Sequence, residues 1–221
     1  MQAPPHGASV PPHGASVPPH GASAPSPWLL RWAHLLPPGG RVLDLACGRG
    51  RHLRWLAARG GMAFPGLTGI DRDAAALAAC ADLAAAGQVE LIVADVENGP
   101  WPCPGRQFDA VLVFNYLWRA LWPKVIDALA PGGLLVYETF ADGNQTVGKP
   151  SRPDFLLQPG ELLARCAGLH IVAYEDGFLE GPARFVQRVV ALRPGAPAES
   201  AAAPLRHALV PHAPAQPPGS V

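Results

Sequence analysis

Short apolar runs alternate with stretches of helical periodicity along most of the chain. Seven runs indicate buried strands, at residues 42–45, 66–71, 89–95, 108–114, 134–138, 169–174 and 185–192. Between them, apolar spacing or helix start signals predict helices at 26–36, 52–56, 74–85, 121–129 and 159–165. Strands that alternate with helices predict an α/β fold, in which right-handed crossovers place helices on both faces of a parallel sheet.

Both ends of the chain lack this pattern and are rich in proline. Residues 4–24 form three copies of a heptapeptide, and each copy contains Pro-Pro and a glycine, which forbid a helix. We therefore predict disordered tails at 1–27 and 194–221 around a folded domain at 28–193. The repeated histidines are either a metal-capture device or, as we favour, a repeat without function: His6, His13 and His20. No metal site is expected.

Charge and cysteine content narrow the functional class. Lysine plus arginine equals aspartate plus glutamate at 17 each, and no basic run appears, so the basic footprint of a nucleic-acid binder is missing. The four cysteines are scattered without a C-x-x-C pair, which favours a reducing compartment. Neither a signal sequence nor an 18-residue apolar run occurs. We expect a cytoplasmic protein that does not interact with membranes.

The first predicted strand ends in a glycine turn that leads directly into a helix. This strand–turn–helix arrangement, with Gly48 and Gly50, is typical of a nucleotide-binding corner, where backbone N–H groups converge on the ligand. The acid of the motif, Asp44, precedes the glycines, and Leu53 stands where a dinucleotide fingerprint has its third glycine. NAD is therefore disfavoured, and ATP is disfavoured because no G-x-x-x-x-G-K-[ST] motif exists.

Polar side chains follow the next three strands as well. Asp71, Asp95 and Asn115 each stand at or beside a strand end, and these ends meet at one edge of a parallel sheet. We predict that Asp71 accepts hydrogen bonds from ribose hydroxyls and that Asp95 meets the exocyclic amine of an adenine. Asp44 is placed either to attract a cationic group or to fix the loop. Acids suit a ligand with amine, sulfonium, ribose and adenine better than they suit phosphates.

These motifs resemble those of class I S-adenosylmethionine-dependent methyltransferases. Residues 44–50 match motif I, 69–71 motif II, 94–96 motif III, 108–111 motif IV, and 131–133 the turn before the fifth strand. The resemblance implies a three-layer, Rossmann-like fold with seven mostly parallel strands and an antiparallel last strand. The cofactor contacts that we predict are Asp44, Ala46, Gly48, Gly50, His52, Asp71, Arg72, Asp95, Val96 and Asn115. The chain departs from the family at Ala46, where glycine is commoner; alanine fits if its φ stays negative.

The residues that handle the methyl acceptor are less clear. Tyr116 follows the fourth strand, where it either contacts the sulfonium and orients the acceptor or is a packed ring. Glu138 ends the fifth strand as either a base or a structural hydrogen-bond acceptor. The long loop at 141–157 is the best candidate for the acceptor side. The tryptophans at helical spacing form either an acceptor pocket or ordinary packing: Trp28, Trp32, Trp118 and Trp122.

The class of acceptor follows from what is missing. Asn115-Tyr116 lacks the two prolines of the (Asn/Asp)-Pro-Pro-(Tyr/Phe) motif, which disfavours methylation of amide or base nitrogens. In size and motif style the chain resembles small bacterial methyltransferases similar to the tellurite-resistance methyltransferase. We predict direct in-line methyl transfer to a small molecule: a thiol, a chalcogen oxyanion or an amine. The alternatives are an RNA or protein methyltransferase and a non-catalytic scaffold. The oligomeric state stays open.

Overall fold

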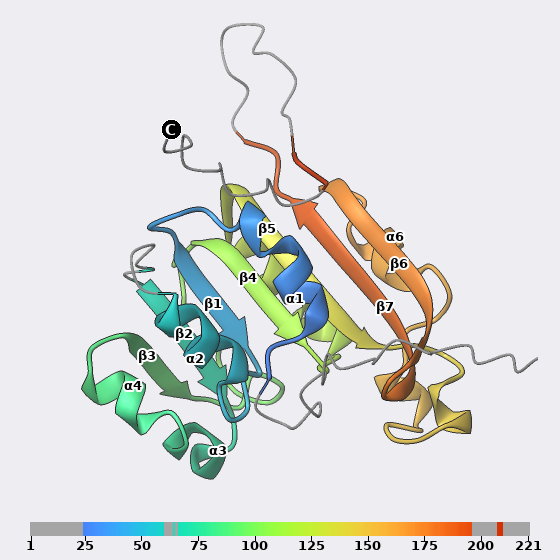
Figure 1. The fold of residues 1–221 in the computed structure, drawn as a ribbon, viewed down its shortest axis with the longest axis horizontal. Coiled ribbons are helices and arrows are strands. Elements are labelled where there is room, and N and C mark those ends of the chain that lie inside the picture. The colour runs from blue at the N-terminus through green and yellow to red at the C-terminus, as the bar shows by residue number, and fades with distance from the viewer. Residues whose placement is uncertain (1–23, 60–63, 65, 196–206, 210–221) are drawn as a thin grey trace, which may run out of the picture.

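One seven-stranded sheet forms the centre of the computed structural model, which describes residues 24–59, 64, 66–195 and 207–209 (Figure 1). The strands are β1 (Arg41–Leu45), β2 (Gly66–Asp71), β3 (Val89–Val93), β4 (Phe108–Phe114), β5 (Leu129–Phe140), β6 (His170–Glu180) and β7 (Ala183–Leu192). Their order across the sheet is β3-β2-β1-β4-β5-β7-β6. The first five in this order pair in parallel, and β7 runs antiparallel to both of its neighbours. The predicted fold is confirmed, including the antiparallel last strand.

Helices cover both faces of the sheet. They are α1 (Pro27–Trp32), α2 (Arg51–Ala58), α3 (Ala74–Ala78), α4 (Ala81–Ala85), α5 (Trp122–Asp127) and α6 (Glu161–Arg165), with short 3-10 turns η1 (Ala33–Leu35), η2 (Arg119–Leu121), η3 (Asn144–Thr146) and η4 (Pro153–Phe155). Figure 1 shows α1 and α2 in front of the sheet, and their buried side chains join one apolar core. A second core on the opposite face takes its helical side chains from α5 and α6. None of the helices in the described ranges has the length and apolarity needed to cross a membrane.

Helix α1 begins where the sequence predicts. The Ser26 hydroxyl accepts a hydrogen bond from the Trp28 amide (3.1 Å), and Pro27 occupies the first turn, where its missing N–H costs nothing. Trp28 and Trp32 are both buried in the core below and contact each other edge to face, with ring centroids 5.7 Å apart. These two tryptophans therefore pack against the sheet.

Several predicted elements differ in extent, among them the strand predicted at 134–138, which spans Leu129–Phe140 as β5. The predicted helix 74–85 is split into α3 and α4, because the chain turns at Cys80, whose thiol donates to the Arg49 carbonyl (3.1 Å). The predicted strand 169–174 continues to Glu180 as one arm of a long hairpin with β7. Its second part is polar and largely exposed, so the apolar pattern that marks a strand is missing there although the backbone ladder continues.

The predicted tails lie mostly outside the described residues, including the heptapeptide repeat and its three histidines. Two exceptions refine the predicted boundaries. The described chain begins at Ala24, so that Ser26 and Pro27 belong to α1. Near the other end, residues 207–209 are described. The carbonyl oxygen of Ala208 lies 2.8 Å from Nε2 of His34, a residue of η1.

The loop from β1 to α2 has three residues in the left-handed region: Ala46 (φ 54°), Gly48 (φ 55°) and Gly50 (φ 69°). The two glycines are needed for different reasons. A Cβ added at Gly50 would lie 2.1 Å from the Cys80 sulfur, whereas one at Gly48 would meet nothing within 4 Å. Gly50 therefore allows the loop to pack against Cys80, while Gly48 supplies backbone freedom only.

We predict that Gly50→Ala lowers the free energy of unfolding by about 2–4 kcal/mol, since it adds a steric clash to the cost of the left-handed conformation. Gly87→Ala is the matched control, because Gly87 has the same φ of 69° as Gly50 and open space around it. Gly87→Ala should lower the free energy of unfolding only by the cost of the left-handed conformation, about 1 kcal/mol. Urea unfolding measures both, and equal costs would show that contact with Cys80 is not the reason for Gly50.

Candidate functional site

A cavity of about 400 Å³ lies at the carboxyl ends of the parallel strands, where ligands of doubly wound sheets bind. The strand register explains why distant residues meet there. Leu45 of β1 pairs with Ile70 of β2 and with Val113 of β4, and Asp71 pairs with Val93 of β3. The lining of the cavity comprises Ala46, Ile70, Asp71, Arg72, Ala94, Asp95, Val96, Glu97, Asn115, Tyr116, Leu117, Thr139, Phe140, Pro150 and Phe155.

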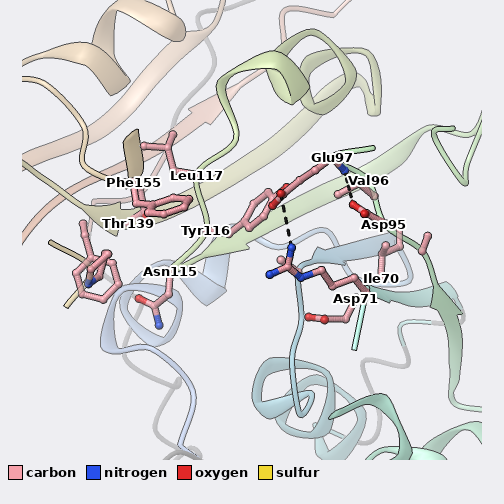
Figure 2. A pocket seen from close by; sticks show the side chains of 15 residues that line it. Ile70, Asp71, Asp95, Val96, Glu97, Asn115, Tyr116, Leu117, Thr139 and Phe155 are labelled. Carbon is pink, nitrogen blue, oxygen red and sulfur yellow. Dashed lines mark hydrogen bonds and ion pairs between the residues drawn. The ribbon is translucent and has the colours of Figure 1, made fainter. Parts of the chain in front are cut away.

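Charge divides this lining into two parts (Figure 2). The charged half consists of the side chains that follow β2 and β3: Asp71, Arg72, Asp95 and Glu97. The uncharged half comes from the ends of β4 and β5 and from the connection between β5 and α6: Asn115, Tyr116, Leu117, Thr139, Phe140, Pro150 and Phe155. Figure 2 shows Asp71, Asp95 and Val96 on one side and Leu117, Thr139 and Phe155 on the other.

Asp71 connects the glycine loop to the second strand. Its Oδ2 accepts the Gly48 amide at 2.7 Å, and its Oδ1 accepts the Asp73 amide at 2.9 Å. Each carboxylate oxygen has a further lone pair, so Asp71 is able to accept from a ligand hydroxyl as well.

Asp95 is held in a comparable way within its own loop. Its Oδ1 accepts the amides of Glu97 (2.9 Å) and Asn98 (3.2 Å), and the Asn98 side chain donates to Oδ2 (2.9 Å). The hydrogen bonds from the Asn98 side chain and the Glu97 amide lower the pKa of Asp95. The group is therefore a fixed, ionised acceptor at neutral pH.

Arg72 and Tyr116 both lie close to Glu97. The Arg72 guanidinium lies 3.6 Å from the Glu97 carboxylate, an ion pair drawn as a dashed line in Figure 2. The Tyr116 hydroxyl is buried and has no hydrogen-bond partner among the described residues. Burial, and then the Glu97 charge, raise the pKa of Tyr116, so this hydroxyl stays protonated.

Four of the predicted cofactor residues do not line the cavity: Asp44, Gly48, Gly50 and His52. Asp44 and His52 are both almost fully buried, with Asp44 Oδ2 at 3.5 Å from His52 Nδ1. The other ring nitrogen of His52 lies 3.3 Å from the Ser26 amide, which donates to it. This arrangement links Asp44 to the start of α1. The six predicted residues that do line the cavity are Ala46, Asp71, Arg72, Asp95, Val96 and Asn115.

Glu138 points away from the cavity and is fully buried. Arg184 donates to its Oε1 (3.1 Å) and Arg188 to its Oε2 (3.3 Å), while the Ser26 hydroxyl also donates to Oε1 (3.2 Å). Two guanidinium groups and a hydroxyl thus occupy its oxygens. Neither arginine belongs to a local motif, so neither could be identified from the sequence pattern.

Several lining residues were missed by the sequence motifs. Thr139 and Phe140 directly follow Glu138, and Glu97 directly follows motif III, so extending each motif by one or two residues would have found them. Pro150 and Phe155 belong to the loop 141–157 that we predicted to form the acceptor side. None of the four tryptophans considered for an acceptor pocket lines the cavity.

The comparison with known families identifies the domain. Residues 42–133 match the model of a methyltransferase domain family. This match identifies that part of the chain as a methyltransferase domain. Two solved structures that share this fold are complexed with SAH and with sinefungin, respectively. No curated protein matches the chain.

Solved structures of methyltransferases share the fold at low sequence identity. A methyltransferase from Methanosarcina mazei is 16% identical over 78% of this chain and 100% of that chain, with a TM-score of 0.58. Coclaurine N-methyltransferase bound to N-methylheliamine and SAH is 12% identical over 73% of this chain and 69% of that chain (TM-score 0.56). The [4+2]-cyclase SpnF is 20% identical over 76% and 79% of the two chains (TM-score 0.57). At such identities the likeness concerns the fold, and the acceptor of this methyltransferase has to be argued from its own residues.

The condition that we set for Ala46 is not met. Its φ is positive, at 54°, in a region that costs a residue with a Cβ about 1–2 kcal/mol. The methyltransferase thus carries strain in the loop beside its cavity, where the family more often has glycine.

We predict that Ala46→Gly raises the free energy of unfolding by about 0.5–1 kcal/mol, because relief of strain exceeds the added freedom of the unfolded chain. Ala94→Gly is the control, since Ala94 also lines the cavity but has no positive φ, and it should destabilise by about 0.5–1 kcal/mol. Urea unfolding at equilibrium measures both. A loss of stability in Ala46→Gly would show that the loop is not strained.

Proposed function

We propose that this methyltransferase transfers the methyl group directly to a small-molecule acceptor. The observation that carries the proposal is the division of one cavity into a charged half and an uncharged half. The charged half suits the polar nucleoside of the cofactor, and the uncharged half leaves a small apolar space beside it for the acceptor.

The residues present fit the cofactor in chemical terms. Asp71 has lone pairs left for ribose hydroxyls, and the ionised Asp95 is an acceptor for an exocyclic amine. The unpartnered Tyr116 hydroxyl supplies a donor in the same wall. We assign Asp71, Asp95, Arg72, Val96 and Asn115 to cofactor binding, and the buried Asp44, Gly48, Gly50 and His52 to fixing the loop that carries Ala46.

When bound, S-adenosylmethionine supplies a methyl group on a positively charged sulfur, which leaves as a neutral thioether. The protein then has to position the acceptor and exclude water rather than activate the methyl group. We assign Tyr116 to orienting the acceptor. We assign Glu138 a structural role, because Arg184, Arg188 and Ser26 occupy its oxygens and it does not face the cavity.

The alternatives have less support. An RNA methyltransferase would need a basic face, but the formal net charge of this chain is zero and its cavity contains a single arginine among three carboxylates. A non-catalytic scaffold would not need Asp71 and Asp95 both held as hydrogen-bond acceptors in a cavity wall. We further propose that the protein acts in the cytoplasm, because its four cysteines are free and buried.

We predict that wild-type protein binds SAH with a micromolar dissociation constant and that Asp71→Asn weakens this binding about 10- to 100-fold, the loss of a charge-assisted hydrogen bond. Asp73→Asn is the matched control. It is the same chemical change two residues away, at a side chain that caps α3 and does not line the cavity. Isothermal titration calorimetry measures all three proteins. Absence of binding by wild type, or equal binding by Asp71→Asn, would refute the assignment.

The acceptor class is tested by the fate of the methyl group. Wild-type protein incubated with methyl-tritiated S-adenosylmethionine and fractionated cell extract should label the small-metabolite fraction. A control without enzyme corrects for background. Label that appears instead in the RNA or protein fraction would overturn the small-molecule proposal.

A further inference from the structure

The uncharged half of the cavity has a fixed wall. Arg119 donates to the carbonyls of Asp154 (2.7 Å) and Leu156 (2.9 Å), on either side of Phe155, and its guanidinium also pairs with Glu161 (2.8 Å). Phe155 is thereby held at the cavity, although 38% of the accessible surface of this residue is exposed to solvent. The ring thus lines the cavity from a connection whose backbone carbonyls are hydrogen-bonded on both sides of it.

A second contact fixes the same connection from the other side. The side chain of Asn144 is almost fully buried, and it donates to the Pro150 carbonyl (2.9 Å) and accepts from the Phe185 amide of β7 (3.2 Å). Pro150 and Phe155, whose connection these contacts hold, line the cavity together with Leu117, and we call these three apolar side chains the apolar slot. A flat apolar molecule matches the slot best.

This half of the cavity disfavours an anion. Its described lining contains no lysine, arginine or histidine, and the Arg152 guanidinium, 5.2 Å from the centroid of the Phe155 ring, already pairs with Asp154 at 2.8 Å. An anion placed there would lose its hydration without gaining a free counter-ion. The charged half next to it holds three carboxylates against the single Arg72, which already faces Glu97 at 3.6 Å. Carboxylates, phosphates and chalcogen oxyanions therefore suit this site poorly.

The described lining of the uncharged half also lacks a protein base. It contains no histidine, aspartate or glutamate, and burial keeps the Tyr116 hydroxyl protonated. An alcohol must lose its proton to become a good nucleophile, whereas a neutral amine already has a lone pair. An amine also keeps the total charge of the cavity constant during the reaction.

We infer that the methyl acceptor is a neutral amine on a flat apolar body, seated in the slot formed by Leu117, Pro150 and Phe155. This inference rests on the proposed function. The nitrogen lone pair forms the new N–C bond while the S–C bond breaks, and that electron pair stays on sulfur. The positive charge passes from sulfur to nitrogen, and the resulting ammonium group releases its proton to water.

The experiment compares matched acceptors with the full-length protein and S-adenosylmethionine. The probes are benzylamine, aniline, 4-(aminomethyl)benzoate, benzyl alcohol and selenite, with the methylated products identified by mass spectrometry. Benzylamine and aniline should be methylated, and the added carboxylate should lower kcat/KM at least about 10-fold. Benzyl alcohol and selenite should give no product. Preferred methylation of selenite, the alcohol or the carboxylated amine would overturn the inference.

The pH dependence gives an independent readout. Only the unprotonated amine has a lone pair, so kcat/KM should rise with pH and level off above the pKa of the acceptor's own ammonium group. Aniline should level off at lower pH than benzylamine, since its conjugate acid is stronger. The ionisable side chains that line the cavity are Asp71, Arg72, Asp95, Glu97 and Tyr116, and the described lining contains no histidine or cysteine. A profile that is the same for both amines would indicate a protein base.

Variants of the slot separate binding from folding. Phe155→Ala should raise KM for benzylamine about 10-fold and leave SAH binding unchanged, and Phe155→Leu should recover most of the loss. Val147→Ala is the control, because Val147 is 43% exposed on the same connection but does not line the cavity. If wild type binds SAH but methylates neither amine, this inference fails while the proposed function stands. If it does not bind SAH, both fail.

Discussion

The hydrogen bond from the Gly48 amide to Asp71 Oδ2, 2.7 Å long, organises the site. It ties the loop after β1 to the end of β2, and the second oxygen of Asp71 fixes the turn that follows β2. The loop needs such a constraint because three of its residues are in the left-handed region, one of them the strained Ala46. Ala46 and Asp71 thereby both stay in the lining of the cavity.

The topology of the sheet explains the two halves of this cavity. In the order β3-β2-β1-β4-β5, the chain reverses its direction of winding at β1, so the loops after β2 and β3 lie on one side and those after β4 and β5 on the other. The charged side chains all come from the first group and the uncharged ones mainly from the second. The parts of the cavity that we assign to the methyl donor and to the methyl acceptor thus come from different loops, which can vary independently on one fold.

Local motifs made much of the fold and part of the site predictable. The strand ends at Asp71 and Asp95 were readable because a carboxylate after an apolar run has a local signature, and both line the cavity. Asp44 was readable as a motif, but its burial against His52 depends on the start of α1. The two arginines that pair with Glu138 come from β7, about fifty residues later, and no local pattern marks them.

The sequence by itself determined the order of strands and helices, the glycine corner and the acids at the strand ends. Each of these depends on residues that are neighbours in the chain, where periodicity and turn chemistry act directly. Only the tertiary structure decided that Gly50 serves packing against Cys80, that Glu138 is paired with two arginines outside the cavity lining and that Phe155 lines the cavity. These properties depend on side chains brought together across the sheet, and their contacts and burial have no trace in local sequence.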